Sequence, residues 1–290
     1  MENFRIVTDS CSDMDYKLSQ QYNIDVVSLK YSSDEFFFDD PVGIERETKL
    51  NEFYDKIKKN QRFKTSQINP EEFLDIFRSY LKNGTDLLFI LCSSGLSGTY
   101  NSAKIAAKEI LESYPERRII VIDSGCASLG LGLLVIEAAK KRDENYSMEE
   151  IAEYIDNIKT KVNHLAILSD LNYLKSGGRI SPTVAFFGNI LGMKPIVSVD
   201  KKDGRLYLHS KQRGMNRALN FLIEELKKED FKGKPQTIYL TYNKEGTEKD
   251  VENGLKWEFN VPIIKSKLSA TISSHTGLGT VAIFYKKLSI

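Results

Sequence analysis

The segment 92–100 carries the residue types best suited to chemistry in this chain. It reads Cys-Ser-Ser-Gly-Leu-Ser-Gly-Thr-Tyr and joins an apolar run to an alanine-rich helical pattern. Small residues at such a turn let the backbone approach a ligand, and the free amides at the start of the helix favour an anion such as a carboxylate. Ser94, Ser97, Gly98 and Thr99 are therefore candidate ligand-binding residues. The alternative is that Ser97 is simply the N-cap of the helix.

A second candidate is His275, which lies among serine, threonine and glycine residues in the segment 269–280. We expect this segment to be a loop, where an imidazole can donate a hydrogen bond to an oxygen anion. The other two histidines, His164 and His209, fall within or beside ordinary elements and are interpreted as structural.

Hydroxyl side chains also occur in the segment 64–73, which reads Lys-Thr-Ser-Gln-Ile-Asn-Pro-Glu-Glu-Phe. Asn69 and Glu72 predict a capping box at the start of a helix, with proline at its first position. The capping box explains the second half of the segment. It leaves Thr65 and Ser66 without a structural explanation.

Alternating β-rich runs and helical patterns in the first half predict the elements that position these residues. Such alternation indicates crossover units and a mostly parallel sheet covered on both faces. The run 87–91 is apolar throughout, as expected for a strand buried on both faces. The expected strands are 4–9, 24–30, 87–92 and 119–123, and the expected helices are 13–22, 49–58, 70–82 and 99–114.

Polar residues follow several of these strands, as in the pair Asp123 and Ser124. In open parallel sheets ligands lie at the carboxyl ends of the strands. Asp123 and Ser124 are therefore site candidates, with turn formation as an equally good explanation.

The next segment, 125–136, predicts a helix with apolar or small residues on every side. A helix that is hydrophobic all round is buried. Its glycines, Gly130 and Gly132, lower helix stability, which suggests close packing. The packing partner is either another helix or a lipid tail.

A charged helix at 147–161 leads into a second α/β set, so we predict two domains, 1–160 and 161–290. The turn 201–204, Lys-Lys-Asp-Gly, indicates a hairpin. The expected strands are 165–169, 195–199, 205–209, 237–241, 262–265 and 281–285, and the expected helices are 211–228 and 245–256.

The segment 171–195 combines a glycine turn with an apolar helix. Gly177 and Gly178 form the turn, and Ser-Pro at 181–182 starts the helix expected at 183–191. Lys175 and Arg179 are either solvated or face an anionic ligand or a partner.

The bulk composition narrows the class of protein. The 290 residues include 41 Lys and Arg against 40 Asp and Glu, a net charge of +1, so a nucleic-acid-binding role is not expected. Three cysteines without a CxxC pair indicate neither a disulfide framework nor a zinc site. We see no signal peptide pattern, and the most apolar stretch is too short for a membrane span. A cytoplasmic protein with no stable membrane insertion is expected.

In their order and spacing, these segments resemble the DegV family, from Val-Thr-Asp-Ser at 7–10 to Ser-His-Thr-Gly at 274–277. The resemblance implies a two-domain DegV-like α/β fold that holds one long-chain, palmitate-like fatty acid in an interdomain tunnel with its carboxylate exposed. The chain is also similar to the fatty-acid-binding subunit of bacterial fatty acid kinase. There, a separate kinase subunit related to dihydroxyacetone kinases phosphorylates the bound acid to an acyl phosphate. The expectation is therefore a lipid-binding protein of lipid transport or fatty acid metabolism, without catalytic residues, metal or cofactor.

The resemblance assigns the carboxylate to Thr65, Ser97 and His275, and Gly-Gly-Arg at 177–179 matches another family element. The chain departs from the family at Ile68, where members often have proline. Supporting candidates for the ligand site are Ser66, Ser94, Gly98, Thr99, Asp123, Ser124 and Arg179. Candidates for docking the kinase are Lys175, Arg179, Lys211 and Arg213, with a solvated rim as the alternative.

Three other functions compete with this one. A serine hydrolase using Ser97 and His275 has the right order of residues, but Thr99 stands where the nucleophile elbow has glycine, and no acidic third member is identified. A nucleotide-dependent enzyme is not favoured because the sequence has no P-loop pattern. A lipid carrier that acts without a kinase stays open.

Overall fold

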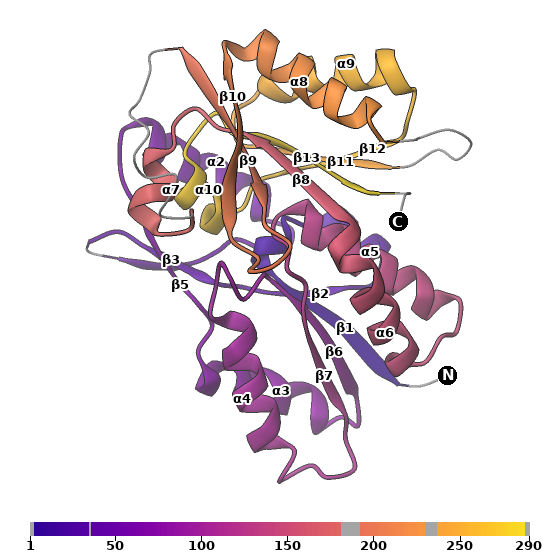
Figure 1. The fold of residues 1–290 in the computed structure, drawn as a ribbon. Coiled ribbons are helices and arrows are strands. Elements are labelled where there is room, and N and C mark those ends of the chain that lie inside the picture. Colours follow the sequence, from indigo (N-terminus) through magenta and orange to yellow (C-terminus); the bar gives the residue numbers. More distant parts are fainter. Residues whose placement is uncertain (1–2, 35, 181–191, 230–236, 288–290) are drawn as a thin grey trace.

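The computed structural model describes residues 3–34, 36–180, 192–229 and 237–287, which form three β-sheets flanked by helices (Figure 1). The apolar helix expected at 183–191 lies outside these residues. Within them, no helix is long and apolar enough to cross a bilayer.

The first sheet has the strand order β2-β1-β6-β7, and all of its described pairings are parallel, as the alternating pattern predicts. The central strand β6 is buried at every position. Its strands are β1 Phe4–Asp9, β2 Asp25–Val27, β6 Asp86–Leu91 and β7 Ile119–Asp123. The helices of this half are α1 Tyr16–Gln21, α2 Arg46–Lys58, α3 Pro70–Leu81, α4 Thr99–Ile110, α5 Leu129–Asp143 and α6 Met148–Ile158.

The single strand expected at 24–30 is wrong, because the chain leaves the first sheet after Val27. The backbone N–H of Leu29 donates to the Ser10 hydroxyl at 3.1 Å instead of pairing with a strand. The chain then enters a small antiparallel sheet with the order β4-β3-β5. Its strands are β3 Lys30–Ser32, β4 Phe37–Asp39 and β5 Lys64–Ser66.

The second sheet is mixed, with the order β10-β9-β8-β13-β11-β12. The hairpin expected at 201–204 joins β9 to β10, which pair antiparallel. Its strands are β8 Val162–Ile167, β9 Met193–Val199, β10 Leu206–Arg213, β11 Ile238–Tyr242, β12 Ile263–Lys267 and β13 Val281–Lys286. The helices of this half are α7 Asn172–Gly177, α8 Met215–Lys227, α9 Thr247–Phe259 and α10 Ala270–Thr276.

The helix expected to start at Lys211 begins only at Met215. The reason is that β10 continues to Arg213, which pairs with Met193 of β9. Gly214, with a φ of +83°, then turns the chain into α8.

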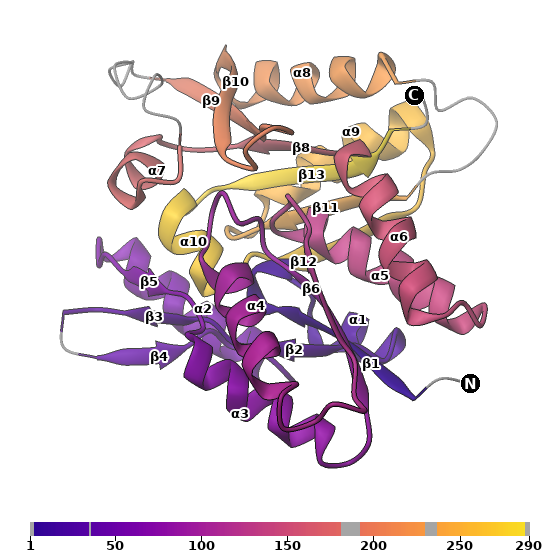
Figure 2. The same cartoon turned by 60° about the horizontal axis from the view of Figure 1, so that its bottom comes forward.

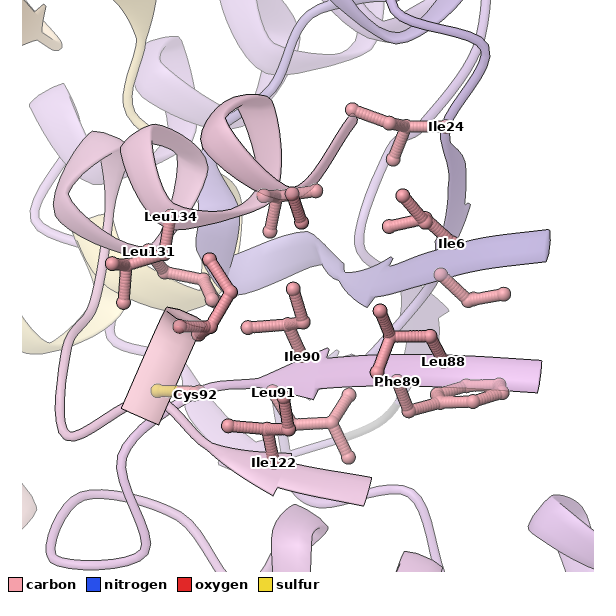
Figure 3. Close-up of a cluster of buried hydrophobic side chains, with 14 of the residues drawn as sticks. Ile6, Ile24, Leu88, Phe89, Ile90, Leu91, Cys92, Ile122, Leu131 and Leu134 are labelled. Atoms are coloured by element: carbon pink, nitrogen blue, oxygen red, sulfur yellow. The ribbon is translucent and has the colours of Figure 1, made fainter. Parts of the chain in front are cut away.

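The helix α5 is the layer that the two large sheets share. Leu131 and Leu134 lie over the first sheet in the buried cluster of Figure 3. On the other side, a Cβ atom at Gly130 would overlap Nε2 of His164, a residue of β8. Gly130 therefore packs against the second sheet, and α5 also packs against another helix, α6, which is one of the two expected kinds of partner. Helices α8 and α9 pack on the outer face of that sheet (Figure 2).

Side chains of β8 alternate between the two faces of the second sheet. Leu165 and Ile167 join the core beneath α8 and α9, whereas His164 and Ala166 point to the opposite face, toward the first sheet. His164 is paired with Phe284 of β13, and their rings meet edge to face at 5.4 Å between centroids. This inward face of β8 and β13 forms one wall of the site described next.

Candidate functional site

A cavity of about 330 Å³ lies between the two large sheets. Its volume falls within the range of about 300–1,000 Å³ that is typical of small-molecule sites. The second sheet supplies one wall, and the strand ends of the first sheet, with β5, α7, α10 and the residues just before α5, supply the rest. Apolar residues that line it include Leu29, Leu96, Ala127, Ala166, Leu174, Val197, Val199, Leu206, Leu268, Ile272, Ala282 and Phe284.

Thr65 and His275 meet at one end of this cavity. Thr65 lies on β5, opposite Tyr31 of β3, and its Oγ1 is 2.7 Å from Nε2 of His275. Both residues, together with Arg179, also border a neighbouring open groove of about 1080 Å³. The hydroxyl–imidazole pair therefore lies where a mostly apolar cavity meets a more polar groove.

His275 lies on the helix α10, so the expectation of a loop at 269–280 is wrong. Ser269 caps the helix by accepting from the N–H of Ile272 at 3.2 Å. The carboxylate of Asp40 accepts from the N–H groups of Ala270 and Thr271, each at 3.0 Å. These bonds satisfy amide groups that the first turn of a helix leaves free, and the helix forms despite its weak helix formers.

The far end of α10 is held by Asn243, which follows β11. Its side-chain oxygen accepts from the N–H groups of Gly279 and Thr280, each at 2.9 Å. Its amide donates to the carbonyl of Gly277 at 2.8 Å. Asp40 from the first half and Asn243 from the second thus hold the segment that carries His275.

The glycine pair of the Gly-Gly-Arg element has two separate roles. Gly177 packs against the imidazole, because a Cβ atom there would overlap Nδ1 of His275. Gly178 adopts a φ of +68° and ends α7, and a Cβ atom there would meet nothing within 4 Å. Only the first glycine is required by the position of His275.

Burial and, to a smaller extent, the positive charge of Arg179 lower the pKa of His275 to about 4. The imidazole is therefore neutral near pH 7 and presents one N–H donor and one acceptor. A carboxylate brought beside it favours the protonated form, since an opposite charge stabilises the imidazolium.

Ser97 lines the same cavity and is half-buried. Its Oγ lies 2.9 Å from Oγ1 of Thr99 and accepts from the Thr99 N–H at 3.3 Å. The N-cap of α4 is Gly98, so Ser97 is not the cap itself. In the described part of the chain, no hydrogen bond joins Ser97 to His275 or His275 to a carboxylate, and this geometry does not favour a Ser-His-Asp hydrolase.

Arg179 holds the neighbouring loops together. Its Nε donates to the carbonyl of Leu96 at 3.2 Å, and its guanidinium also donates to the carbonyl of Gly177. Arg179 borders the cavity and the groove, but Lys175, Lys211 and the exposed Arg213 line neither. The four expected docking residues therefore do not form one cluster around the opening.

The remaining candidate ligand-site residues lie in two separate pockets. Ser66 and Gly98 line the cavity, and Thr99 is buried behind Ser97. Ser94, Asp123 and Ser124 instead line a separate pocket of about 170 Å³ beside the β9–β10 turn, where Oδ1 of Asp123 accepts from the Ser94 N–H at 3.1 Å. The reason is that β7 is an edge strand of the first sheet, and its carboxyl end faces that turn.

Several polar residues of the cavity were not predicted from the sequence, among them Gln67 and His164. Gln67 lines it and donates to the Ser102 hydroxyl at 2.9 Å, while its side-chain oxygen leaves no room for a Cβ atom at Gly98. His164, interpreted above as structural, also faces the cavity. The sequence of β8, Val-Asn-His-Leu-Ala-Ile, does not alternate between polar and apolar residues, so it carries no signal for this placement.

Comparison with known proteins agrees with this architecture. Residues 3–288 match the model of the DegV family, which is described as a family of uncharacterised proteins. A DegV domain-containing protein of Clostridium perfringens is 35% identical over 288 residues, which cover 98% of each chain. A DegV lipid-binding protein of Thermotoga maritima has a TM-score of 0.88 at 26% identity, covering 100% of this chain and 99% of that one. A fatty-acid-binding DegV family protein of Thermus thermophilus has a TM-score of 0.86 at 27% identity. The match covers 99% of this chain and 100% of that one. The chain belongs to the DegV family.

Proposed function

We propose that this protein binds one long-chain, palmitate-like fatty acid in the cavity between its sheets, with the carboxylate held by Thr65, Ser97 and His275. The observation that carries the proposal is the Thr65–His275 pair, which closes an apolar cavity where it meets an open groove. The described binding of lipid and fatty acid by the two solved relatives supports the same class of ligand.

The energetics favour such a ligand. Burying an acyl chain contributes roughly 0.8 kcal/mol per methylene. Over a long chain this can outweigh the roughly 4–15 kcal/mol that association costs. A buried carboxylate without partners is costly. Two hydroxyl groups and an imidazole can supply its hydrogen bonds and leave one side open toward the groove.

The open side suggests what happens next to the bound acid. We propose that a separate kinase subunit, related to dihydroxyacetone kinases, reaches the carboxylate through the groove and phosphorylates it to an acyl phosphate. This chain then acts as the lipid-binding subunit, in the cytoplasm, with domains 1–160 and 161–290 on the two sides of the ligand. A fatty acid carrier without a kinase is the alternative, and it predicts binding without acyl phosphate formation.

Native mass spectrometry of the purified protein tests the binding step. The expected result is a stoichiometric adduct that releases one fatty acid on denaturing extraction. The triple variant Thr65→Ala, Ser97→Ala, His275→Ala should lose most of its palmitate adduct. Ser94→Ala is the matched control, because Ser94 lies in the other pocket. An apo mass that does not change on incubation with palmitate would contradict the proposal, as would full binding by the triple variant.

A further inference from the structure

Arg62 is a cation on the wall of the open groove, and in the described part of the chain no carboxylate pairs with it. Arg62 is exposed and lines the groove together with Thr65, Arg179 and His275. Its guanidinium lies over the ring of Tyr173, with the central carbon 3.6 Å from the ring centroid. Among the described residues, none of its N–H groups has a hydrogen-bond or ion-pair partner. The donors of Arg62 are therefore available to a ligand in the groove.

The ring of Tyr173 fixes the place of this guanidinium relative to the carboxylate site. Tyr173 lies on α7, and its ring packs against the segment of His275, because a Cβ atom at Gly277 would lie 2.6 Å from its Cδ2 atom. Arg62 also precedes Thr65 by three residues, which limits the distance between their Cα atoms to roughly 11 Å. A guanidinium stacked on an aromatic ring is held in a defined plane. The charge is therefore fixed beside the end of the cavity where the carboxylate is expected.

The other cations of the groove are less suited to a phosphate ligand. Arg179 already donates to the carbonyls of Leu96 and Gly177. Lys64 of β5 carries an ammonium point charge on a flexible stem, whereas a guanidinium matches two phosphate oxygens with two parallel N–H groups. Asp34 is the one carboxylate side chain that lines the groove in the described ranges. The groove thus has an excess of positive charge, and the stacked guanidinium is its best phosphate ligand.

We propose that Arg62 contacts the phosphoryl group during its transfer to the fatty acid, as an arginine that this chain supplies to the active site of the kinase. The inference rests on the proposed phosphorylation and names a catalytic residue for it. In that step a carboxylate oxygen attacks the γ-phosphorus of a nucleoside triphosphate, and a new O–P bond forms. The bond between the γ-phosphorus and the bridging oxygen breaks, the nucleoside diphosphate leaves with the electron pair, and no proton is transferred. An arginine stabilises the negative charge on the oxygens of the transferred group.

The first test is a binding measurement that needs no kinase. Wild type and Arg62→Gln are titrated calorimetrically with palmitate and with the β-ketophosphonate analogue of palmitoyl phosphate, in which a methylene group replaces the bridging oxygen. Arg62→Gln should bind palmitate within about twofold of wild type and the phosphonate about tenfold or more weakly, the size of a hydrogen bond to a charged group. Arg62→Lys, which keeps the charge without the planar fork, should fall between the two. The matched control is Arg78→Gln, an exposed arginine of α3 that does not line the groove, and it should bind both ligands like wild type.

The second test is the kinetics of acyl phosphate formation by a purified kinase subunit related to dihydroxyacetone kinases. Palmitate-loaded protein is the varied substrate. In Arg62→Gln, kcat should fall by at least about a hundredfold with little change in KM, because an arginine that acts on the transition state contributes roughly 10³–10⁵ to kcat. A rise in KM with an unchanged kcat would make Arg62 a docking residue and overturn the inference.

The outcomes keep the inference apart from the function on which it rests. Failure of wild-type protein to bind palmitate would defeat the fatty acid proposal. Palmitate binding without acyl phosphate formation would defeat the kinase step and leave the lipid-binding role intact. If wild type does both, an unchanged phosphonate affinity in Arg62→Gln would overturn the role of Arg62 alone. An equal loss of affinity for palmitate and phosphonate would do the same, because it shows a general effect on the site.

Discussion

The side chains of Thr65 and His275 lie 2.7 Å apart although 210 positions separate them in the chain. Thr65 comes from the small antiparallel sheet, and His275 comes from a helix that leads into the second sheet. Their contact therefore depends on the docking of the two halves of the molecule. It also means that substitutions at either residue test the same end of the cavity.

Replacing Thr65 by valine should weaken palmitate binding with little change in fold. Valine keeps the shape of the side chain and removes the hydroxyl, and a hydrogen bond to a charged group contributes about 1.5–3 kcal/mol. We expect a loss of affinity of at least about tenfold by isothermal titration calorimetry. Ser94→Ala should bind like wild type, and equal affinities for Thr65→Val and wild type would remove Thr65 from the site.

Alanine substitutions at the neighbouring glycines Gly177 and Gly178 should have different effects. In Gly177→Ala the new methyl group displaces the His275 ring, so palmitate affinity should fall by about tenfold or more. In Gly178→Ala the methyl group has space, but alanine in the left-handed conformation costs roughly 1 kcal/mol. That variant should lose stability in urea unfolding and keep its affinity. The reverse pattern would contradict the contact between Gly177 and His275.

The low pKa of His275 makes stability depend on pH. Its pKa is about 4 in the folded protein against 6.5 in the unfolded chain, so the unfolded state binds more protons between these values. The contribution of this group is complete above pH 6.5 and is lost as the pH falls toward 4, by up to about 3 kcal/mol. The measurement is the free energy of unfolding of wild type minus that of His275→Gln, at pH 7 and pH 4.5. A difference that does not change with pH would contradict the burial of a neutral imidazole.

Only the difference in unfolding free energy between the two proteins is informative, because buried carboxyl groups, Asp40 among them, act in the opposite direction. Burial raises the pKa of Asp9 and of Asp13 to about 6. Their folded state binds more protons than the unfolded state, so they favour folding as the pH falls through 6. Both groups are present in wild type and in His275→Gln, and their contributions cancel.

Replacing Asn243 by alanine should lower both the stability of the fold and the affinity for palmitate. Asn243→Ala leaves the buried N–H groups of Gly279 and Thr280 and the carbonyl of Gly277 without partners. We expect a loss of roughly 2–4 kcal/mol in the free energy of unfolding and weaker palmitate binding, since α10 is no longer fixed. Asn83→Ala, which removes an exposed bond to the Ser79 carbonyl, is the control and should lose less than about 0.5 kcal/mol.

The docking candidates can be tested apart from lipid binding. Charge reversal in the double variant Lys175→Glu, Arg213→Glu should leave palmitate affinity unchanged, because neither residue lines the cavity. If these residues contact the kinase subunit, formation of acyl phosphate should fall by about tenfold or more at low salt and less at high salt. Normal phosphorylation by the variant would remove both residues from the docking surface.

Local signals in the sequence predicted part of the fold well. Asn69, Pro70 and Glu72 predicted the start of α3, and the capping box is present in the structure. The parallel first sheet also followed from the alternation of strands and helices. These features depend on neighbours in the chain, so they can be predicted from the order of residues.

Features held by distant partners were missed. The strands β3, β4 and β5 have three residues each, too few to show an alternating pattern. The helix α10 depends on Asp40, which lies 230 positions from Ala270. The same reason explains the site. No local pattern in β8 indicates that His164 faces the cavity, and only the resemblance to a family brought Thr65 and His275 together.

The position of α5 has a consequence for how the molecule unfolds. One continuous buried cluster contains Leu131 of this helix, strands of the first sheet, and Tyr239 and Phe284 of the second. Neither half can complete its interior without the other, because the helix would present one bare apolar flank to water. The two halves should therefore melt in a single cooperative transition, and a fragment that ends near residue 160 should be prone to aggregate.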